Sequence, residues 1–167
     1  PVDSYPVWED NEWVIKDGER ARAHMPDGCL YFENCNPVLE RVETSALLRQ
    51  VKWRTYFTDE QLRDFEDKAK FFFENTDYAI MGGFGGNILE CGQELRGWAN
   101  FMMDLVANRS FAKDLMDELV EMHLTNLDMY LEAVGDYIQI IQMGDDMGTQ
   151  EASQISLDMY RELVKPR

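Results

Sequence analysis

From residue 58 onward the chain alternates between long amphipathic helices and short β-type runs, and this alternation limits the folds that it can adopt. The apolar spacing predicts helices over residues 58–75, 97–107, 110–134 and from Ser156 to Val164, and strands over 78–81 and 137–143. Thr58 and Gln61 have the spacing of a capping box, and Ser110 and Ser156 are expected to cap the last two helices. Strands that alternate with helices pair in parallel through right-handed crossovers. The sequence therefore predicts an α/β layer or barrel.

The first 35 residues have a different pattern. Trp13-Val14-Ile15 and the run 20–24 flank Asp17-Gly18, which is typical of a β-hairpin turn, and a further short strand is expected over 29–32. We interpret residues 1–35 as a hairpin excursion and 36–167 as barrel units, within one domain over residues 1–167.

Composition excludes some classes of partner. The chain is 45% hydrophobic, enough for a sizeable core, and its net charge of −16 argues against nucleic acid and against an anionic membrane surface. Three cysteines form no disulfide framework and no secretory signal is visible, so we expect a cytoplasmic protein. Because the chain opens on Pro1 rather than Met, we also expect a portion of a longer protein.

The candidate site residues follow the two predicted strands. In parallel α/β folds, the loops after the strands' C-terminal ends form the active-site face. The first such loop is expected over 82–97 and the second over 144–154. The first loop holds Phe84, Asn87, Glu90, Gln93, Glu94 and Arg96, and the second holds Asp145, Asp146, Thr149, Gln150 and Ser153.

Asp145 and Asp146 are adjacent carboxylates, which are costly to bury without partners. A metal, a cationic substrate, Arg96 or a shared proton would compensate for them. The alternative is a solvated turn in which Asp146 caps the next segment. The sequence leaves both interpretations open.

Other motifs favour structural roles. The glycines at 82–86 lack the register and the lysine of a phosphate-binding loop, so close backbone packing is favoured. His24, Cys29 and Cys35 lack C-x-x-C spacing, which disfavours a structural zinc site, and His123 is interpreted as a packed or partly exposed residue in the middle of a helix.

The C-terminal segment 137–167, YIQIIQMGDDMGTQEASQISLDMYRELVKPR, resembles the strand, D-D-x-G-x-Q loop and "ISxxMYRExxKPR" helix of the uroporphyrinogen decarboxylase superfamily. Residues 77–97 resemble its preceding strand, loop and L-R-G. The likeness extends from about Asn36 to the end and is specific in the last thirty residues. It implies a (β/α)8 TIM barrel, of which this chain would supply about the central half.

The superfamily includes true decarboxylases, which bind a polycarboxylate porphyrinogen, and enzymes that transfer methyl groups from methoxy compounds or methylamines with a corrinoid protein. Where the decarboxylases look to have S-H-A-G or T-W-A-G, this chain has Asp145 and Asp146. Each close carboxylate pair would cost about 4 kcal/mol at an effective dielectric of 20, so electrostatics favours the O-demethylase-like methyltransferases. Decarboxylation of uroporphyrinogen is the alternative, and a non-catalytic fragment or scaffold is the second.

Under the methyltransferase hypothesis, the acids bind a metal, protonate the leaving group or orient the substrate. The candidate catalytic residues are Asp145, Asp146, Glu90 and Glu94, and the candidate substrate-binding residues are Phe84, Asn87, Gln93, Arg96 and Gln150. The resemblance implies a corrinoid protein as partner and zinc as a candidate metal of unknown ligands, with no cofactor bound within this chain. Exposed strand edges of an incomplete barrel favour a homo-oligomer.

Overall fold

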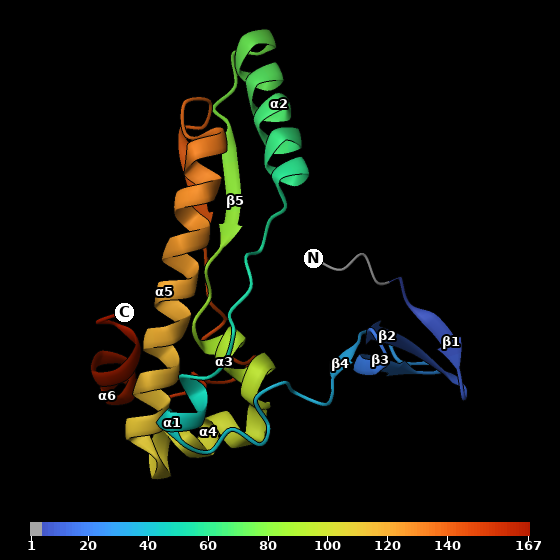
Figure 1. Ribbon diagram of the computed structural model, residues 1–167, viewed down its shortest axis with the longest axis vertical. Coiled ribbons are helices and arrows are strands. Elements are labelled where there is room, and N and C mark those ends of the chain that lie inside the picture. The colour runs from blue at the N-terminus through green and yellow to red at the C-terminus, as the bar shows by residue number, and fades with distance from the viewer. Residues whose placement is uncertain (1–4) are drawn as a thin grey trace. The chain divides into compact units, whose positions relative to one another are not determined.

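The computed structural model describes residues 5–167, so the first four residues of the predicted hairpin region lie outside the described part of the chain. The fold is mixed α/β, as predicted (Figure 1). Its strands are β1 (Val7–Glu9), β2 (Glu12–Asp17), β3 (Arg20–Pro26), β4 (Glu33–Asn34), β5 (Met81–Gly85) and β6 (Ile140–Met143). Its helices are α1 (Ser45–Leu48), α2 (Asp59–Asn75), α3 (Leu89–Arg96), α4 (Trp98–Ala107), α5 (Arg109–Val134) and α6 (Leu157–Met159), which the π-helical turn η1 (Tyr160–Val164) follows.

The chain divides into two compact units. Unit 1 comprises residues 1–50 and 91–115, and unit 2 comprises residues 51–90 and 116–167. Helices α3 and α5 have residues in both units. The single domain over 1–167 stays a prediction.

Unit 1 contains an antiparallel sheet in the order β1-β2-β3-β4. The predicted hairpin is confirmed, since β2 and β3 pair around a turn in which Gly18 has a φ of 61°. The strand expected over 29–32 is wrong: Gly28 turns the chain with a φ of 80°, and pairing with β3 begins only at Glu33. Val14 and Ala23 are the buried apolar residues of this sheet.

In unit 2, α2 begins with the predicted capping box. The Thr58 hydroxyl accepts a hydrogen bond from the Gln61 N–H, and the Gln61 side chain accepts one from the Thr58 N–H. The helix also has Asp59 and Glu60 in its first turn, which the helix dipole favours. The predicted range of 58–75 is therefore confirmed to within one residue.

Replacing Thr58 with alanine is expected to lower the free energy of unfolding by about 1 kcal/mol, because the Gln61 N–H loses its acceptor at the start of α2. Thr58→Ser keeps the hydroxyl and is the matched control. Urea denaturation of both variants measures the difference, and equal stabilities would show that the box contributes nothing.

The predicted strand 78–81 and glycine loop 82–86 need correction. The strand is β5, and it consists largely of the glycines that were expected to form a loop. A Cβ at Gly82 would lie 2.7 Å from the Tyr130 hydroxyl oxygen and 2.9 Å from Ile138 Cδ1. Gly82 therefore lets β5 lie directly against α5, whereas the turn itself begins at Gly85 and Gly86, which have φ of 91° and 70°.

Strands β5 and β6 pair in parallel, as predicted. The segment 137–143 is only partly extended, since β6 begins at Ile140 after a turn at the end of α5. Among residues 5–167, these two strands pair with no other strand, and no closed barrel is present. Asp145 and Asp146 follow the C-terminal end of β6, where the sequence places them.

The limits of the four predicted helices agree with the structure to within one residue, whereas α1 and α3 were not predicted. Helix α5 begins at Arg109, one residue before Ser110, which was expected to cap it. Ser156 does cap α6, because its hydroxyl accepts a hydrogen bond from the Met159 N–H.

An aromatic core joins α2, β5 and α5 of unit 2 (Figure 1). The Tyr130 ring of α5 lies 6.1 Å from Phe65 of α2 and 5.9 Å from Phe84 of β5, between ring centroids. Phe57 lies 5.6 Å from Phe65 and 5.8 Å from Tyr130, so it closes the cluster. These contacts fix β5 against the two helices.

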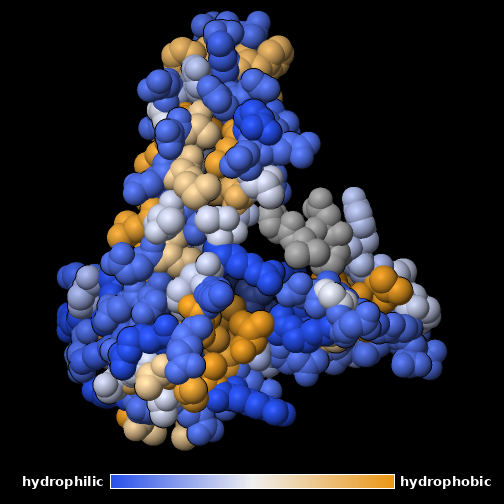
Figure 2. Space-filling model, in the orientation of Figure 1, coloured by the Kyte–Doolittle hydropathy of each residue, from blue (hydrophilic) through white to orange (hydrophobic). Residues whose placement is uncertain are grey.

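The surface is mostly hydrophilic, with apolar residues exposed over α2 and β5 (Figure 2). They include Phe71, Phe72, Phe73 and Met81, which are between 49% and 60% exposed. None of the helices within residues 5–167 combines the length and the hydropathy that crossing a bilayer requires.

Candidate functional site

Asp145 closes the N-terminal end of α3. Its carboxylate accepts hydrogen bonds from the backbone N–H groups of Ile88, Leu89 and Glu90, at 2.9, 2.6 and 3.0 Å. These are the free N–H groups of the helix start, where a carboxylate is favoured by the helix dipole. Asp145 therefore attaches the loop after β6 to the loop after β5.

Glu90 and Asn87 lie beside this cap. Glu90 Oε2 accepts a hydrogen bond from Asn87 Nδ2 at 2.7 Å and another from the Asp146 N–H at 3.2 Å. The Asp146 side chain is exposed, and its Oδ1 accepts a hydrogen bond from the Gly148 N–H at 3.0 Å. We call Asn87, Glu90, Asp145 and Asp146 the acid–amide cluster.

Gln154 holds the loop that contains Asp146. Its side chain donates hydrogen bonds to the carbonyls of Asp146 and Gly148 at 3.1 and 3.3 Å, and Gly148 pairs with Ser153 in an isolated bridge. Gln150 lies exposed at the tip of this small hairpin. The sequence placed Gln150 in the site, but it did not identify Gln154 as the residue that holds the loop.

Phe84 packs in the aromatic core of unit 2 rather than in a loop. Its ring centroid lies 6.3 Å from that of Tyr56 and 6.4 Å from that of His123. Burial raises the pKa of the neighbouring Tyr130 phenol, so this hydroxyl stays protonated at neutral pH.

Gln93, Glu94 and Arg96 were expected in a loop, and this is wrong because residues 89–96 form helix α3. All three belong to unit 1. Gln93 Nε2 lies 3.7 Å from the Met102 sulfur, and Arg96 is buried with its Nε donating to Asp104 Oδ2 at 2.8 Å. Glu94 is exposed at a shallow hollow of about 210 Å³ that Arg20, Arg22 and Cys35 also line.

Tyr56 and His123 join the acid–amide cluster through hydrogen bonds that the sequence did not reveal. Tyr56 Oη lies 2.7 Å from His123 Nδ1, and His123 Nε2 lies 2.8 Å from the Asn87 carbonyl oxygen. The sequence left a packed and a partly exposed histidine open, and the structure has the packed one, since His123 is 7% exposed. Its partners are 36 and 67 residues away, so no local pattern could identify them.

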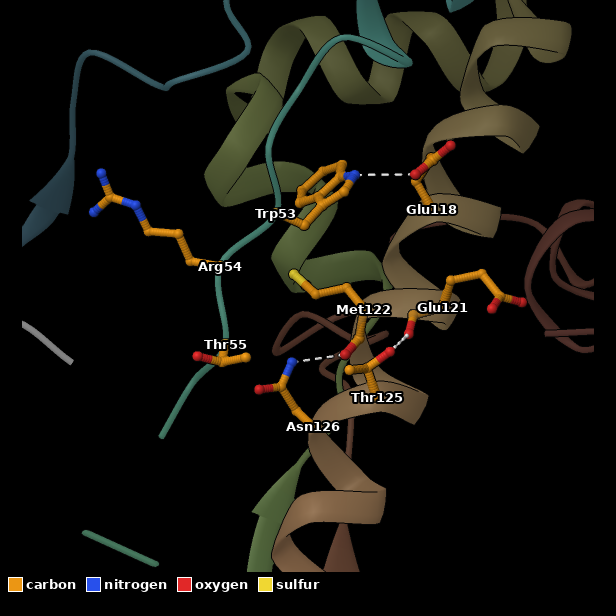
Figure 3. A pocket seen from close by; sticks show the side chains of 8 residues that line it. All are labelled: Trp53, Arg54, Thr55, Glu118, Glu121, Met122, Thr125 and Asn126. Atoms are coloured by element: carbon orange, nitrogen blue, oxygen red, sulfur yellow. Dashed lines mark hydrogen bonds between the residues drawn. The ribbon is translucent and has the colours of Figure 1, made fainter. Parts of the chain in front are cut away.

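Another hollow, of about 240 Å³, belongs to unit 2 and lies between the segment 53–55 and α5 (Figure 3). The Trp53 indole N–H donates to Glu118 Oε2 at 3.0 Å. Asn126, on its floor, accepts from the Tyr56 N–H and donates to the Met122 carbonyl. These bonds fasten the extended segment to α5 just before Tyr56.

No group of three or more histidine, cysteine or acidic side chains within residues 5–167 is arranged to hold a metal ion. Cys35 is not a free thiolate: burial, followed by the charge of Glu12, raises the pKa of its thiol despite the opposing charge of Arg20. The thiol instead lies 3.6 Å from the Ala21 carbonyl oxygen.

The acid–amide cluster places three carboxylates, in two different situations, at one edge of the β5–β6 sheet. Asp145 is occupied by three N–H donors, whereas Asp146 Oδ2 and Glu90 Oε1 accept no hydrogen bond from the described residues. Such oxygens can accept a hydrogen bond, bind a cation or exchange a proton with a ligand.

Comparison of the chain with protein-family models, with curated proteins and with solved structures returns no match.

Proposed function

We propose that this chain is the central portion of a (β/α)8-barrel enzyme of the uroporphyrinogen decarboxylase superfamily, and that the full-length protein transfers a methyl group from a small methylated substrate to a corrinoid protein. The main support is that the Glu90 carboxylate accepts a hydrogen bond from the Asp146 N–H beside the C-terminal ends of two paired parallel strands. That edge is the active-site face of barrel enzymes.

The barrel proposal is supported by the exposure of β6. Ile140, Ile141 and Met143 are 50%, 37% and 49% exposed, although parallel strands normally have both faces covered. Further strands and helices of a longer protein would bury these side chains. The same exposed edges support self-association when they are left uncovered.

Methyl transfer assigns two roles to the three acidic residues. The corrinoid supplies the nucleophile when it is bound. The bond between the methyl carbon and the substrate oxygen or nitrogen breaks, and its electron pair remains on that atom, which then takes a proton. Glu90 and Asp146 would orient this leaving group, with one of them protonated as the acid that delivers the proton, while Asp145 holds the loops in place.

Decarboxylation of uroporphyrinogen is less well supported because a polycarboxylate needs cationic partners. The acid–amide cluster contains no lysine or arginine, and the guanidinium of Arg96 is bound to Asp104 in unit 1. Location in the cytoplasm is part of the proposal, since the corrinoid partner would act there.

The test uses the full-length protein with cob(I)alamin and separate methoxy-aromatic and methylamine donors, with methylcobalamin formation followed by absorbance. Glu90→Gln and Asp146→Asn are each expected to lower kcat at least about tenfold, because each removes a carboxyl group that can exchange a proton with the leaving group. Glu151→Gln, which changes an exposed acid of the same loop outside the cluster, is the control and is expected to leave kcat unchanged.

Two outcomes would contradict the proposal. Release of carbon dioxide from uroporphyrinogen without any methyl transfer would favour the decarboxylase. Full activity of both cluster variants would mean that the acid–amide cluster is not the site.

A further inference from the structure

His123 is a buried histidine whose two ring nitrogens both have partners. It lies on α5, with Nδ1 2.7 Å from Tyr56 Oη and Nε2 2.8 Å from the Asn87 carbonyl oxygen. A carbonyl oxygen only accepts hydrogen bonds, so Nε2 must be the protonated nitrogen. In the neutral ring, Nδ1 then accepts the Tyr56 O–H, and every polar atom of the side chain is satisfied.

The bond to Asn87 adds a restraint to the turn between β5 and α3. Asn87 follows Gly85 and Gly86, which both have positive φ. Beyond Asn87, α3 begins at Leu89, where the Asp145 carboxylate binds the first N–H groups of the helix. The His123 N–H therefore holds a carbonyl group between the glycine pair and the helix start.

Asn87 links this restraint to the carboxylate of Glu90. Its side-chain Nδ2 donates to Glu90 Oε2 at 2.7 Å, and the same oxygen accepts from the Asp146 N–H at 3.2 Å. The contacts thus run without a break from Tyr56 through His123 and Asn87 to Glu90 and Asp146.

We infer that His123 is a positioning residue: its Nε2–H holds the Asn87 backbone so that the Asn87 amide sets the orientation of the Glu90 carboxylate. The inference rests on the proposed function for its catalytic meaning, because Glu90 is the group that would meet the substrate. His123 acts only through Asn87.

The first test is the tautomer. The chain contains two histidines, so ¹⁵N NMR of the full chain, with His24→Gln to assign His24, resolves His123 alone. We expect the ¹⁵N shift of an Nε2 that carries a proton, as the Asn87 carbonyl oxygen requires. A ring with its proton on Nδ1 and none on Nε2 would overturn the inference.

The second test is amide hydrogen exchange, which needs no substrate. His123→Ala is expected to raise exchange at Ile88, Glu90 and Asp146 at least about tenfold, beyond any uniform rise across α5. His123→Gln can still donate a side-chain N–H to the Asn87 carbonyl and should restore much of the protection. Tyr56→Phe, which removes only the hydroxyl, should shift Nδ1 and leave these amides protected.

Thr125→Ala, on an exposed position of the same helix, is the matched control. A rise confined to α5 itself, or one that His123→Gln does not reverse, would mean that His123 has only a packing role. In the full-length enzyme, His123→Ala should lower kcat with little change in KM. If exchange behaves as expected but no methyl donor is turned over, the proposed function fails while the positioning role stands.

Discussion

Replacing Arg96 with alanine is expected to lower the free energy of unfolding by about 3–5 kcal/mol, the usual cost of removing one partner from a buried ion pair. Arg96 and Asp104 are 6% and 8% exposed, and their side chains meet at 2.8 Å. The Arg96 Nη1 also donates to the carbonyls of Leu39 and Glu40. The substitution therefore removes the Arg96 donor from the buried Asp104 carboxylate and from the Glu40 carbonyl, whereas the Leu39 carbonyl keeps its hydrogen bond from the Val42 N–H.

Urea denaturation followed by circular dichroism measures this loss. The double variant Arg96→Met, Asp104→Leu removes both charges and is expected to recover a large part of the stability. Lys68→Ala breaks an exposed pair with Asp64 and serves as the control, with an expected loss below about 0.5 kcal/mol. A loss of under about 1 kcal/mol for Arg96→Ala would show that the pair is hydrated in solution.

Patterns of local spacing predicted several elements of the two units. The capping box at Thr58, the apolar period of α2 and the serine cap of α6 are contacts between residues a few positions apart. The hairpin of β2 and β3 is equally local, since Asp17-Gly18 forms its turn. Such contacts depend on the neighbouring sequence, so the sequence alone was sufficient to predict these caps, this helix and this hairpin.

The glycine segment was predicted wrongly because its surroundings are not local. Glycine runs usually indicate loops. At position 82, however, Tyr130 leaves no room for a side chain larger than that of glycine, and Tyr130 is 48 positions further along the chain. Contact with α5 outweighs the weak intrinsic strand preference of glycine. The strand was predicted over 78–81, and the structure has it over 81–85, where it contacts α5.

The candidate site was predicted in part. Parallel pairing correctly implied that the loops after the two strands meet, and Asn87, Glu90, Asp145 and Asp146 do lie together. Residues 93–96 were predicted to join them and do not. They belong to helix α3 and to unit 1, whereas the sequence was interpreted as a loop there. Arg96 and Asp104 lie on two helices separated by Gly97, so no single helical period pairs them.

Asp145→Ala is expected to lower the free energy of unfolding by about 2–3 kcal/mol, more than an ordinary helix cap. Its carboxylate is the acceptor for three consecutive N–H groups, at Ile88, Leu89 and Glu90. Leu89 is fully buried, so water does not readily replace the lost acceptor there. Asp145→Asn keeps one carbonyl oxygen and should lose roughly half as much.

The neighbouring Asp146→Ala is the matched control, because it removes the same charge one position along the chain. The Asp146 side chain is exposed and bonds only to the Gly148 N–H, so its loss should cost less than about 0.5 kcal/mol. Equal losses for the two variants would contradict the cap. The difference also separates two causes of inactivity: Asp145 variants would lose activity together with loop order, whereas Asp146 variants would lose it with the fold intact.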